Sequence, residues 1–302
     1  KQFAEILTKI APCITDEAAE APLIRSAIGC LEALLIAQDA QAWNNTHDLA
    51  ITPRRGLQGL LELSTDPRPK VRKRALDSIS NILNNPPPAP TAQHVAAGTI
   101  VDYSLNSLIS ILQELSTMSN KKLKAKGTME EFSSRIIRAL RLINAVVSTG
   151  QWPATKIEPL CDSLLEVTKS SDQYLVSASF ECFEVLFKSM AESTVTSGLA
   201  DNKFLRVLDT IFTLKPSNAD THLAGAWIAV VVKAMSTYAV HQPLKCFQKI
   251  PEVFRIMAHY MASETTEIYI SASNCLMAII SDAIKNDQLL FPPAVSERPS
   301  HQ

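Results

Sequence analysis

Glycine and aromatic residues are scarce in this chain of 302 residues, and their scarcity narrows the choice of fold. There are 8 glycines, and aromatic residues make up 6% of the sequence. Tight hairpin turns depend on glycine, and β-strands favour aromatic and β-branched side chains. The composition therefore argues against an all-β fold and favours packed helices.

The signatures of metal, catalytic and membrane chemistry are also missing from the sequence. The six cysteines contain no C-x-x-C pair, and the six histidines form no H-x-x-x-H or His/Cys cluster, so we expect reduced thiols in an intracellular compartment and no metal site. No phosphate-binding loop, nucleophile elbow or dinucleotide fingerprint occurs. The longest apolar run, residues 223–232, is too short to cross a bilayer. We therefore predict a protein that is no enzyme and has no cofactor, no small-molecule substrate and no membrane partner.

What the sequence does contain is a recurring helical pattern, clearest after Asp66. The carboxylate of Asp66 is suited to cap a helix, and Pro67 then occupies the first turn, where its missing N–H costs nothing. Apolar side chains follow at the spacing of one buried helical face, namely Val71, Ala75, Ile79, Ile82 and Leu83. The helix should stop at residues 84–88, where three prolines follow two asparagines.

The same pattern recurs along the chain as pairs of helices. Second helices are predicted to begin their buried faces around Ile24, Val71, Ile136, Leu175, Leu223 and Tyr269. A first helix is predicted before each of them, at residues 3–10, 54–63, 105–115, 157–167, 204–214 and 246–261. Most starts are about 40–50 residues apart, which is the HEAT/armadillo period. We predict an all-α fold over residues 1–291, a HEAT/armadillo-type right-handed α-solenoid of about six antiparallel helix pairs.

Three segments interrupt this pattern. Residues 84–99 contain the proline run and should form an extended loop between repeats. Residues 119–128 lack an apolar face and are expected to form a basic loop between paired helices. Residues 292–302 are expected to be a disordered tail. Because the chain begins inside an apolar helical pattern, we interpret it as a fragment of a longer protein.

Basic residues are concentrated in two short stretches, although the formal net charge is -1. Residues 54–74 and residues 121–141 each hold seven basic and two acidic residues. In HEAT repeats a turn Asp and a helix Arg often form a ladder between neighbouring repeats, a role that fits Asp66 and Arg72. The remaining cations of the first stretch are candidates for binding phosphate or an acidic partner: Arg54, Arg55, Arg68, Lys70, Lys73 and Arg74. A weaker patch, for which a solvated loop is the favoured interpretation, consists of Lys121, Lys122, Lys124 and Lys126.

The position of the first cluster supports anion binding over a merely solvated face. Cations near a helix N-terminus oppose the macrodipole, and a bound anion would reverse that penalty. Only Tyr103 and Phe132 lie near the basic stretches, so base stacking is not expected. If RNA is bound, its backbone phosphates should dominate the contacts, without readout of sequence.

Residues 54–75, together with the proline run at 86–90, resemble the ribosomal RNA-processing protein 12 family. The resemblance implies a large HEAT-repeat protein of the nucleolus and nucleus, with possible shuttling to the cytoplasm. It implies a scaffold role in small-subunit precursor assembly, pre-rRNA processing and export, with pre-ribosomal RNA, assembly factors and Ran or other export machinery as partners. The family has no catalytic residues to transfer.

Two other classes of function share a helical solenoid and stay open at this point. An importin-like nuclear transport receptor would present acidic patches for basic cargo and a Ran-binding surface. A regulatory scaffold of a phosphatase or kinase complex would present an apolar ridge of inter-helix loops. The basic stretches favour the ribosome-assembly scaffold over both.

Overall fold

The computed structural model describes residues 2–16, 18–45, 51–87, 93–119, 126–192 and 201–285, and within them it consists of helices joined by turns and loops, with no strand. The first helices of the pairs are α1 (Gln2–Thr15), α4 (Pro53–Leu63), α6 (Ala97–Ser119), α8 (Ile157–Val167), α10 (Asp201–Thr213) and α12 (Pro243–Met261). The second helices are α2 (Ala21–Ile36), α5 (Pro69–Asn84), α7 (Lys126–Val147), α9 (Gln173–Glu192), α11 (Thr221–His241) and α13 (Thr266–Lys285). A short α3 (Ala40–Asn44) and a 3-10 turn, η1 (Ala154–Lys156), complete the described elements. The prediction of an all-α fold built from about six helix pairs is confirmed.

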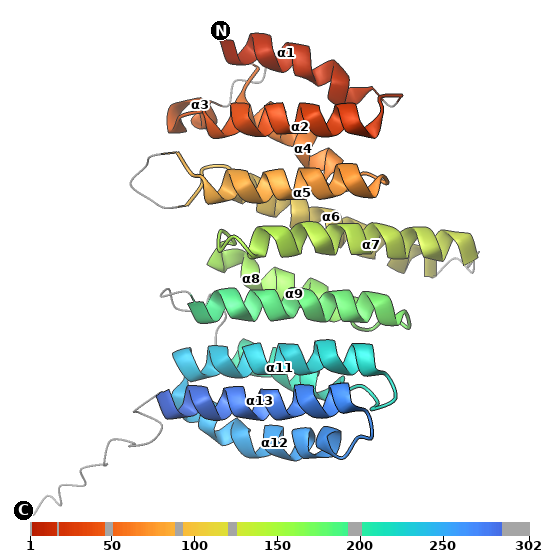
Figure 1. Ribbon diagram of the computed structural model, residues 1–302, viewed down its shortest axis with the longest axis vertical. Coiled ribbons are helices and arrows are strands. Elements are labelled where there is room, and N and C mark those ends of the chain that lie inside the picture. Colours follow the sequence, from red (N-terminus) through yellow and green to blue (C-terminus); the bar gives the residue numbers. More distant parts are fainter. Residues whose placement is uncertain are drawn as a thin grey trace, which may run out of the picture. The chain divides into compact units, whose positions relative to one another are not determined.

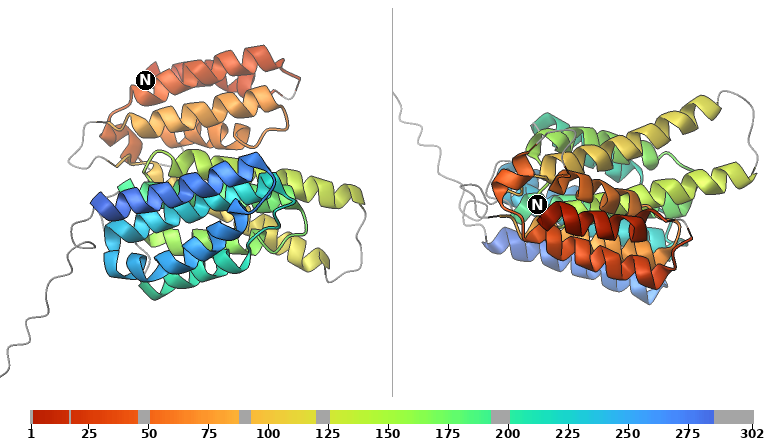
Figure 2. Two further views of the ribbon diagram at one scale, coloured as in Figure 1. Left: turned by 60° about the horizontal axis from the view of Figure 1, so that its bottom comes forward. Right: turned by 90° about the horizontal axis from the view of Figure 1, so that it is seen from above.

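The chain divides into two compact units, residues 1–182 and 183–302, and the division falls inside α9. In the first unit, α2, α5 and α7 lie side by side in one layer, and α4 and α6 lie behind them (Figure 1). The α6–α7 pair is longer than its neighbours and projects beyond them (Figure 2). In the second unit, α13 contacts both α11 and α12.

Prolines set where several of these helices begin. Pro22, Pro53 and Pro69 each occupy a first-turn position of α2, α4 and α5, where proline is tolerated because no hydrogen bond is lost. The short α3 was not expected from the sequence. Asp39 caps it by accepting from Ala42 N, and it places Trp43 in the core with no exposed surface.

The predicted helix phase holds in the first unit and, apart from its first residue, in α11, but it fails in α13. Ile24, Val71, Ile136 and Leu175 are all buried. Tyr269, however, is 46% exposed, and the buried face of α13 runs instead through Ile268, Ala272, Cys275 and Ile279. In α11, Leu223 is only partly buried, but Trp227 and Val231, predicted for the same face, are fully buried. Because α13 carries apolar residues on more than one face, its periodicity does not determine which face is buried.

The two predicted loops are shorter than expected. Residues 97–99 belong to α6, because Ala97, Ile100 and Val101 extend its buried face by a turn and His94 Nδ1 accepts from Ala96 N just before it. Asn84 is the last residue of α5. Residues 126–128 belong to α7, whose next residues Met129 to Glu131 are exposed and so show no apolar pattern. The rest of the basic loop at 120–125 and the predicted tail at 292–302 lie outside the described residues.

One described helix, α11, is long and apolar enough to cross a membrane by length and composition, although the sequence pattern suggested too short a run. More than half of the apolar 18-residue stretch within that helix is buried, and the helix packs against α12 and α13. These contacts are those of the core helix of the second unit. Length and composition alone are therefore weak evidence for a membrane span here.

Candidate functional site

The turn between α4 and α5 forms differently from the sequence prediction. Pro69 restricts the residue before it to extended backbone, so Arg68 cannot be helical and becomes the N-cap with φ -75° and ψ 113°. The helix therefore begins at Pro69, and the prediction that Asp66 caps it with Pro67 in the first turn is wrong. The Asp66 carboxylate instead accepts from Arg68 N at 2.8 Å and from Arg68 Nε and Nη2, both at 2.9 Å.

This pairing changes the electrostatics of Asp66. Burial opposes ionisation, but the side-chain and backbone hydrogen bonds from Arg68 outweigh it and hold the pKa of the Asp66 carboxyl below its usual value. Both oxygens of the carboxylate are thus occupied by a single bidentate arginine. Asp66 is a neutralised charge, not a free ligand.

Arg72 makes no hydrogen bond to the Asp66 carboxylate or, among the described residues, to a neighbouring helix pair. Its side chain is buried, and Nη1 donates to the main-chain oxygens of Asp66 at 2.7 Å and Pro67 at 3.4 Å. The contacts that would build a ladder between repeats are not formed here, because Arg68 already binds both oxygens of the Asp66 carboxylate within the same turn. Arg72 therefore stabilises the turn by satisfying carbonyl groups that no helix can satisfy.

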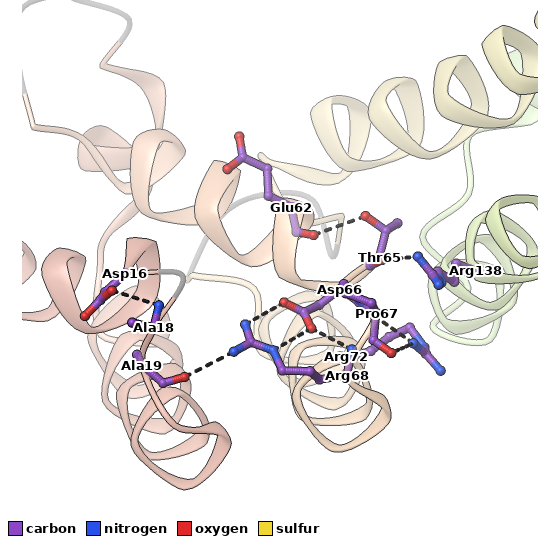
Figure 3. A network of polar contacts seen from close by, with 10 residues as sticks. All are labelled: Asp16, Ala18, Ala19, Glu62, Thr65, Asp66, Pro67, Arg68, Arg72 and Arg138. Atoms are coloured by element: carbon purple, nitrogen blue, oxygen red, sulfur yellow. Dashed lines mark hydrogen bonds and ion pairs between the residues drawn. The ribbon is translucent and has the colours of Figure 1, made fainter. Parts of the chain in front are cut away.

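The bonds between neighbouring helix pairs come from two other arginines. Arg68 Nη1 donates to Ala19 O of the α1–α2 turn at 3.2 Å, and Arg138 Nη1 of α7 donates to Thr65 O at 3.5 Å. Figure 3 shows Arg68 pointing toward Ala19, and Arg72 and Arg138 lying on the opposite side of the turn. Three successive helix pairs are thus joined at the α4–α5 turn by arginine-to-carbonyl contacts.

Half of the predicted anion-binding cations have partners within the fold. Arg54 Nε donates to Trp43 O at 2.9 Å and its Nη1 to Thr99 Oγ1 at 2.8 Å. Arg74 forms an ion pair of 3.0 Å with Glu32 of α2, and a Cβ at Gly29 would come within 3.1 Å of its guanidinium. Together with Arg68, these two residues have structural roles that the sequence did not reveal.

The other three, Arg55, Lys70 and Lys73, are exposed. None of them has a hydrogen bond or ion pair with the part of the chain that the structure describes. Lys70 and Lys73 lie on the outward face of α5, and Arg55 lies on α4. Of the weaker patch, Lys121, Lys122 and Lys124 lie outside the described residues, and Lys126 begins α7 with its side chain undescribed.

Two arginines of α7 join this region although the sequence analysis did not select them. Burial lowers the pKa of Arg72, and the nearby charges of Arg141 and Arg138 lower it further, while Asp66 raises it. The signal in the sequence was the three-residue spacing of Arg135, Arg138 and Arg141, which puts them on one side of a helix. Arg135 is neutralised by Glu114, at 2.8 and 3.2 Å.

A polar cavity lies beside Arg138. Its volume is about 520 Å³, and it is lined by Thr65, Ser107, Ser110, Ile111, Glu131, Arg135 and Arg138. Hydroxyl and guanidinium donors predominate over its one lining carboxylate. The arrangement can hold an anion but contains no nucleophile–base pair of the kind that hydrolytic chemistry needs.

Among the described residues, no group of three His, Cys, Asp or Glu side chains could hold a metal ion. The described cysteines are free, and burial raises the pKa of Cys246 to about 11 and of Cys275 to about 12, so these thiols stay protonated near neutral pH. Such thiols are core side chains and not nucleophiles.

Comparison with known proteins shows where the chain belongs. Residues 1–171 match the family described as RRP12-like, N-terminal HEAT repeats. The chain belongs to this RRP12-like family. It is 66% identical over 297 residues to ribosomal RNA-processing protein 12 of Saccharomyces cerevisiae, covering 98% of this chain and 24% of that protein. The putative ribosomal RNA-processing protein 12 of Schizosaccharomyces pombe is 23% identical, with 92% and 22% covered.

The human RRP12-like protein is 21% identical, with 87% of this chain and 18% of that protein covered. The chain thus spans about a quarter or less of the length of these RRP12-like relatives. Among solved structures, a designed armadillo repeat protein has a TM-score of 0.42 at 12% identity, covering 90% of this chain and 99% of that one. An archaeal HEAT-like repeat protein from Thermococcus onnurineus has a TM-score of 0.39 at 15% identity, with 88% and 99% covered. At such TM-scores the fold assignment rests on the helix pairs and on the family match.

Proposed function

We propose that this RRP12-like chain is a non-enzymatic scaffold segment of a ribosome-biogenesis factor. The observation that carries the proposal is the 66% identity, along nearly the whole chain, to a protein named for ribosomal RNA processing. Repeated helix pairs provide extended binding surfaces, and the described residues hold no catalytic constellation. The proposed setting is small-subunit precursor assembly and pre-rRNA processing in the nucleolus and nucleus.

The finer parts of the proposal concern partners. The scaffold would contact pre-ribosomal RNA and assembly factors through its basic edge, and the longer protein would take part in nuclear export, with Ran or other export machinery as partner and with shuttling to the cytoplasm. Arg55, Lys70 and Lys73 support the first part, because they are exposed cations without partners among the described residues. Arg54, Arg68 and Arg74 would support the surface that carries these cations, since each has a contact within the fold.

The test uses the full-length protein that contains this chain, with Arg55→Glu, Lys70→Glu and Lys73→Glu combined. We expect normal expression and a shift of the protein out of the pre-ribosomal fractions of a sucrose gradient. A matched control carries Lys9→Glu, Arg206→Glu and Arg255→Glu, three exposed cations elsewhere on the chain. Wild-type sedimentation of the triple variant over a range of salt would show that these cations are only a solvated face.

A further inference from the structure

Three arginines from two neighbouring helices lie next to the α4–α5 turn, and none of them is paired with a carboxylate among the described residues. Arg72 of α5 is within electrostatic reach of Arg138 and Arg141 of α7. Arg72 donates to carbonyl oxygens, Arg138 has one long bond to Thr65 O, and Arg141 is exposed. Within the described part of the chain, none of the three forms an ion pair. The one carboxylate among the charges acting on Arg72, that of Asp66, is already paired with Arg68.

The alignment of the two helices adds a fourth cation. Ser80 Oγ of α5 donates to Ala145 O of α7 at 3.5 Å, so these two residues lie level with one another on the neighbouring helices. Lys73 lies seven residues, about two helical turns, before Ser80 on α5, and Arg138 lies seven residues before Ala145 on α7. Lys73 is exposed, so it flanks the arginines on the solvent side.

Acidic residues in this area are too few to neutralise these four cations. Asp77 lies one turn after Lys73 on α5, and Glu131 lies about two turns before Arg138 and lines the polar cavity. Neither forms an ion pair with the cluster. Like charges held close together and partly out of water repel each other more strongly than at an open surface. A bound anion would remove that repulsion.

We propose that Arg72, Arg138, Arg141 and Lys73 form a site for the backbone phosphates of RNA. Arg138 and Arg141 would contact phosphate directly, and Arg72 would lie behind them and add its charge. The 520 Å³ cavity beside Arg138 would receive the adjoining nucleotide, whose hydroxyl groups suit Thr65, Ser107 and Ser110. This inference rests on the proposed function, and it names a site there that is distinct from Arg55 and Lys70.

The chemistry of the surface favours RNA over an acidic protein. A protein interface is held by apolar or aromatic anchors at its centre, and the cavity offers one apolar side chain, Ile111, among six polar ones. Phosphate contacts need no such anchor, and arginine forks match phosphate oxygens in pairs. The absence of aromatic side chains from the lining agrees with contacts to the backbone and not to stacked bases.

The test measures binding of a 20-nucleotide single-stranded RNA of mixed sequence to the 302-residue chain as the salt concentration is varied. In the variant, Arg138→Gln and Arg141→Gln remove two charges while keeping hydrogen-bonding groups. We expect the dissociation constant near 0.1 M salt to rise by roughly tenfold, and the salt slope to fall by about 1.4, or about 0.7 for each lost phosphate contact. The control variant, Arg206→Gln with Arg255→Gln, removes two exposed arginines elsewhere and should bind as the wild type does.

Two outcomes would overturn the site. If the double variant binds RNA with wild-type affinity and salt slope, the cluster contacts no phosphate. If poly-glutamate displaces RNA completely and its own binding is lost in the same variant, the site serves acidic proteins instead. The single variant Arg141→Gln guards against misfolding, because Arg141 is exposed and has no hydrogen bond within the described residues. Lys73 belongs to both sets of residues, but the sedimentation variant changes neither Arg138 nor Arg141, so failure of the RNA-binding test leaves the sedimentation test unaffected and the two proposals can fail separately.

Discussion

The two units of the chain satisfy their free carbonyl groups with different side chains. In the first unit, Arg68, Arg72 and Arg138 donate to carbonyl oxygens at the turns between helices. In the second unit, buried aromatic residues do so: Trp227 Nε1 donates to Ile211 O at 2.8 Å, and Tyr260 Oη donates to Pro216 O at 2.6 Å. In both units a side-chain donor satisfies a free carbonyl oxygen, but only the arginine donors of the first unit add positive charge.

Aromatic contacts also connect the helices of the second unit. Phe204 lies edge-on to Phe187 and to Tyr238, with ring centroids 5.2 and 4.5 Å apart. Trp227 lies 5.7 Å from Tyr260 in the same measure. Such contacts stabilise the fold but supply no positive charge to which an anion could bind. A phosphate-binding surface is therefore expected in the first unit, where the groups that join the helix pairs are cationic.

The largest expected effect is that of a charge placed in the core of the first unit. Val71 has no exposed surface, so Val71→Asp would bury a carboxylate without a partner and should destabilise the unit by several kcal/mol. Thermal unfolding followed by far-UV circular dichroism measures this loss. Lys70→Asp, one residue earlier on the exposed face, is the control and should melt like the wild type. An unchanged melting curve for Val71→Asp would mean that the helix phase of α5 is wrong.

How well the sequence predicted the fold depends on the amphipathicity of each helix. On α5 the charged residues leave one apolar face, so Val71 could be placed in the core from spacing alone. On α13 the spacing allowed Tyr269 or Ile268 to be buried, and only the contacts with α11 and α12 decide for Ile268. The short α3 carries too few residues to show any period. Periodicity therefore found the helix pairs but not every buried face.

A second prediction concerns acid stability, for which the first unit has a buried histidine. Burial lowers the pKa of His94 to about 4, and its Nδ1 accepts from Ala96 N at 3.0 Å, which requires the neutral ring. Because the folded pKa is below the unfolded value of about 6.5, the unfolded chain binds the proton first. Stability is full above pH 6.5 and falls as the pH drops toward 4, by about 2 kcal/mol between pH 7.5 and 5.

Urea unfolding at a series of pH values between 7.5 and 5 measures this dependence. The control is His94→Asn, which keeps an acceptor for the Ala96 N–H and does not titrate. We expect its stability to change much less over the same range. Equal slopes for the two proteins would show that His94 is not the titrating group.

A third and smaller effect is expected from one hydrogen bond in the second unit. Tyr260→Phe would leave Pro216 O without its donor in a buried place and should cost about 1–2 kcal/mol. Urea unfolding followed by tryptophan fluorescence measures this loss, since Trp227 lies beside Tyr260 and contributes to the signal together with Trp43 and Trp152. Tyr174→Phe is the control, since Tyr174 is exposed and its ring makes no described contact. If the two variants have equal urea midpoints, the hydrogen bond from Tyr260 to Pro216 O does not stabilise the second unit measurably.

The candidate site could be predicted from the sequence only as a concentration of charge. Composition located the basic stretch, and three of its cations, Arg55, Lys70 and Lys73, remain exposed. It could not show that Arg54 and Arg68 are held by carbonyl oxygens, because every residue has a carbonyl and the sequence does not mark which ones are free. Nor could it show that the charge of Arg141 acts on Arg72, since that proximity depends on how α5 and α7 align.

The smallest expected effect tests the other side of the comparison, the apolar surface of the second unit. Met277 on α13 is 66% exposed and Phe247 on α12 is 59% exposed, whereas the exposed positions of α5 in the first unit, apart from Pro69 at its start, are charged or polar. Exposed side chains away from special features change stability little, so Met277→Glu should shift the free energy of unfolding by less than about 0.5 kcal/mol. Met257→Glu, at a fully buried position of α12, is the matched control and should unfold the unit.

The exposed variant Met277→Glu should also lower the light scattering of concentrated solutions, because large apolar patches promote association. A large loss of stability in Met277→Glu would mean that this face is covered, and the contrast between a charged first unit and an apolar second unit would then not hold at the surface.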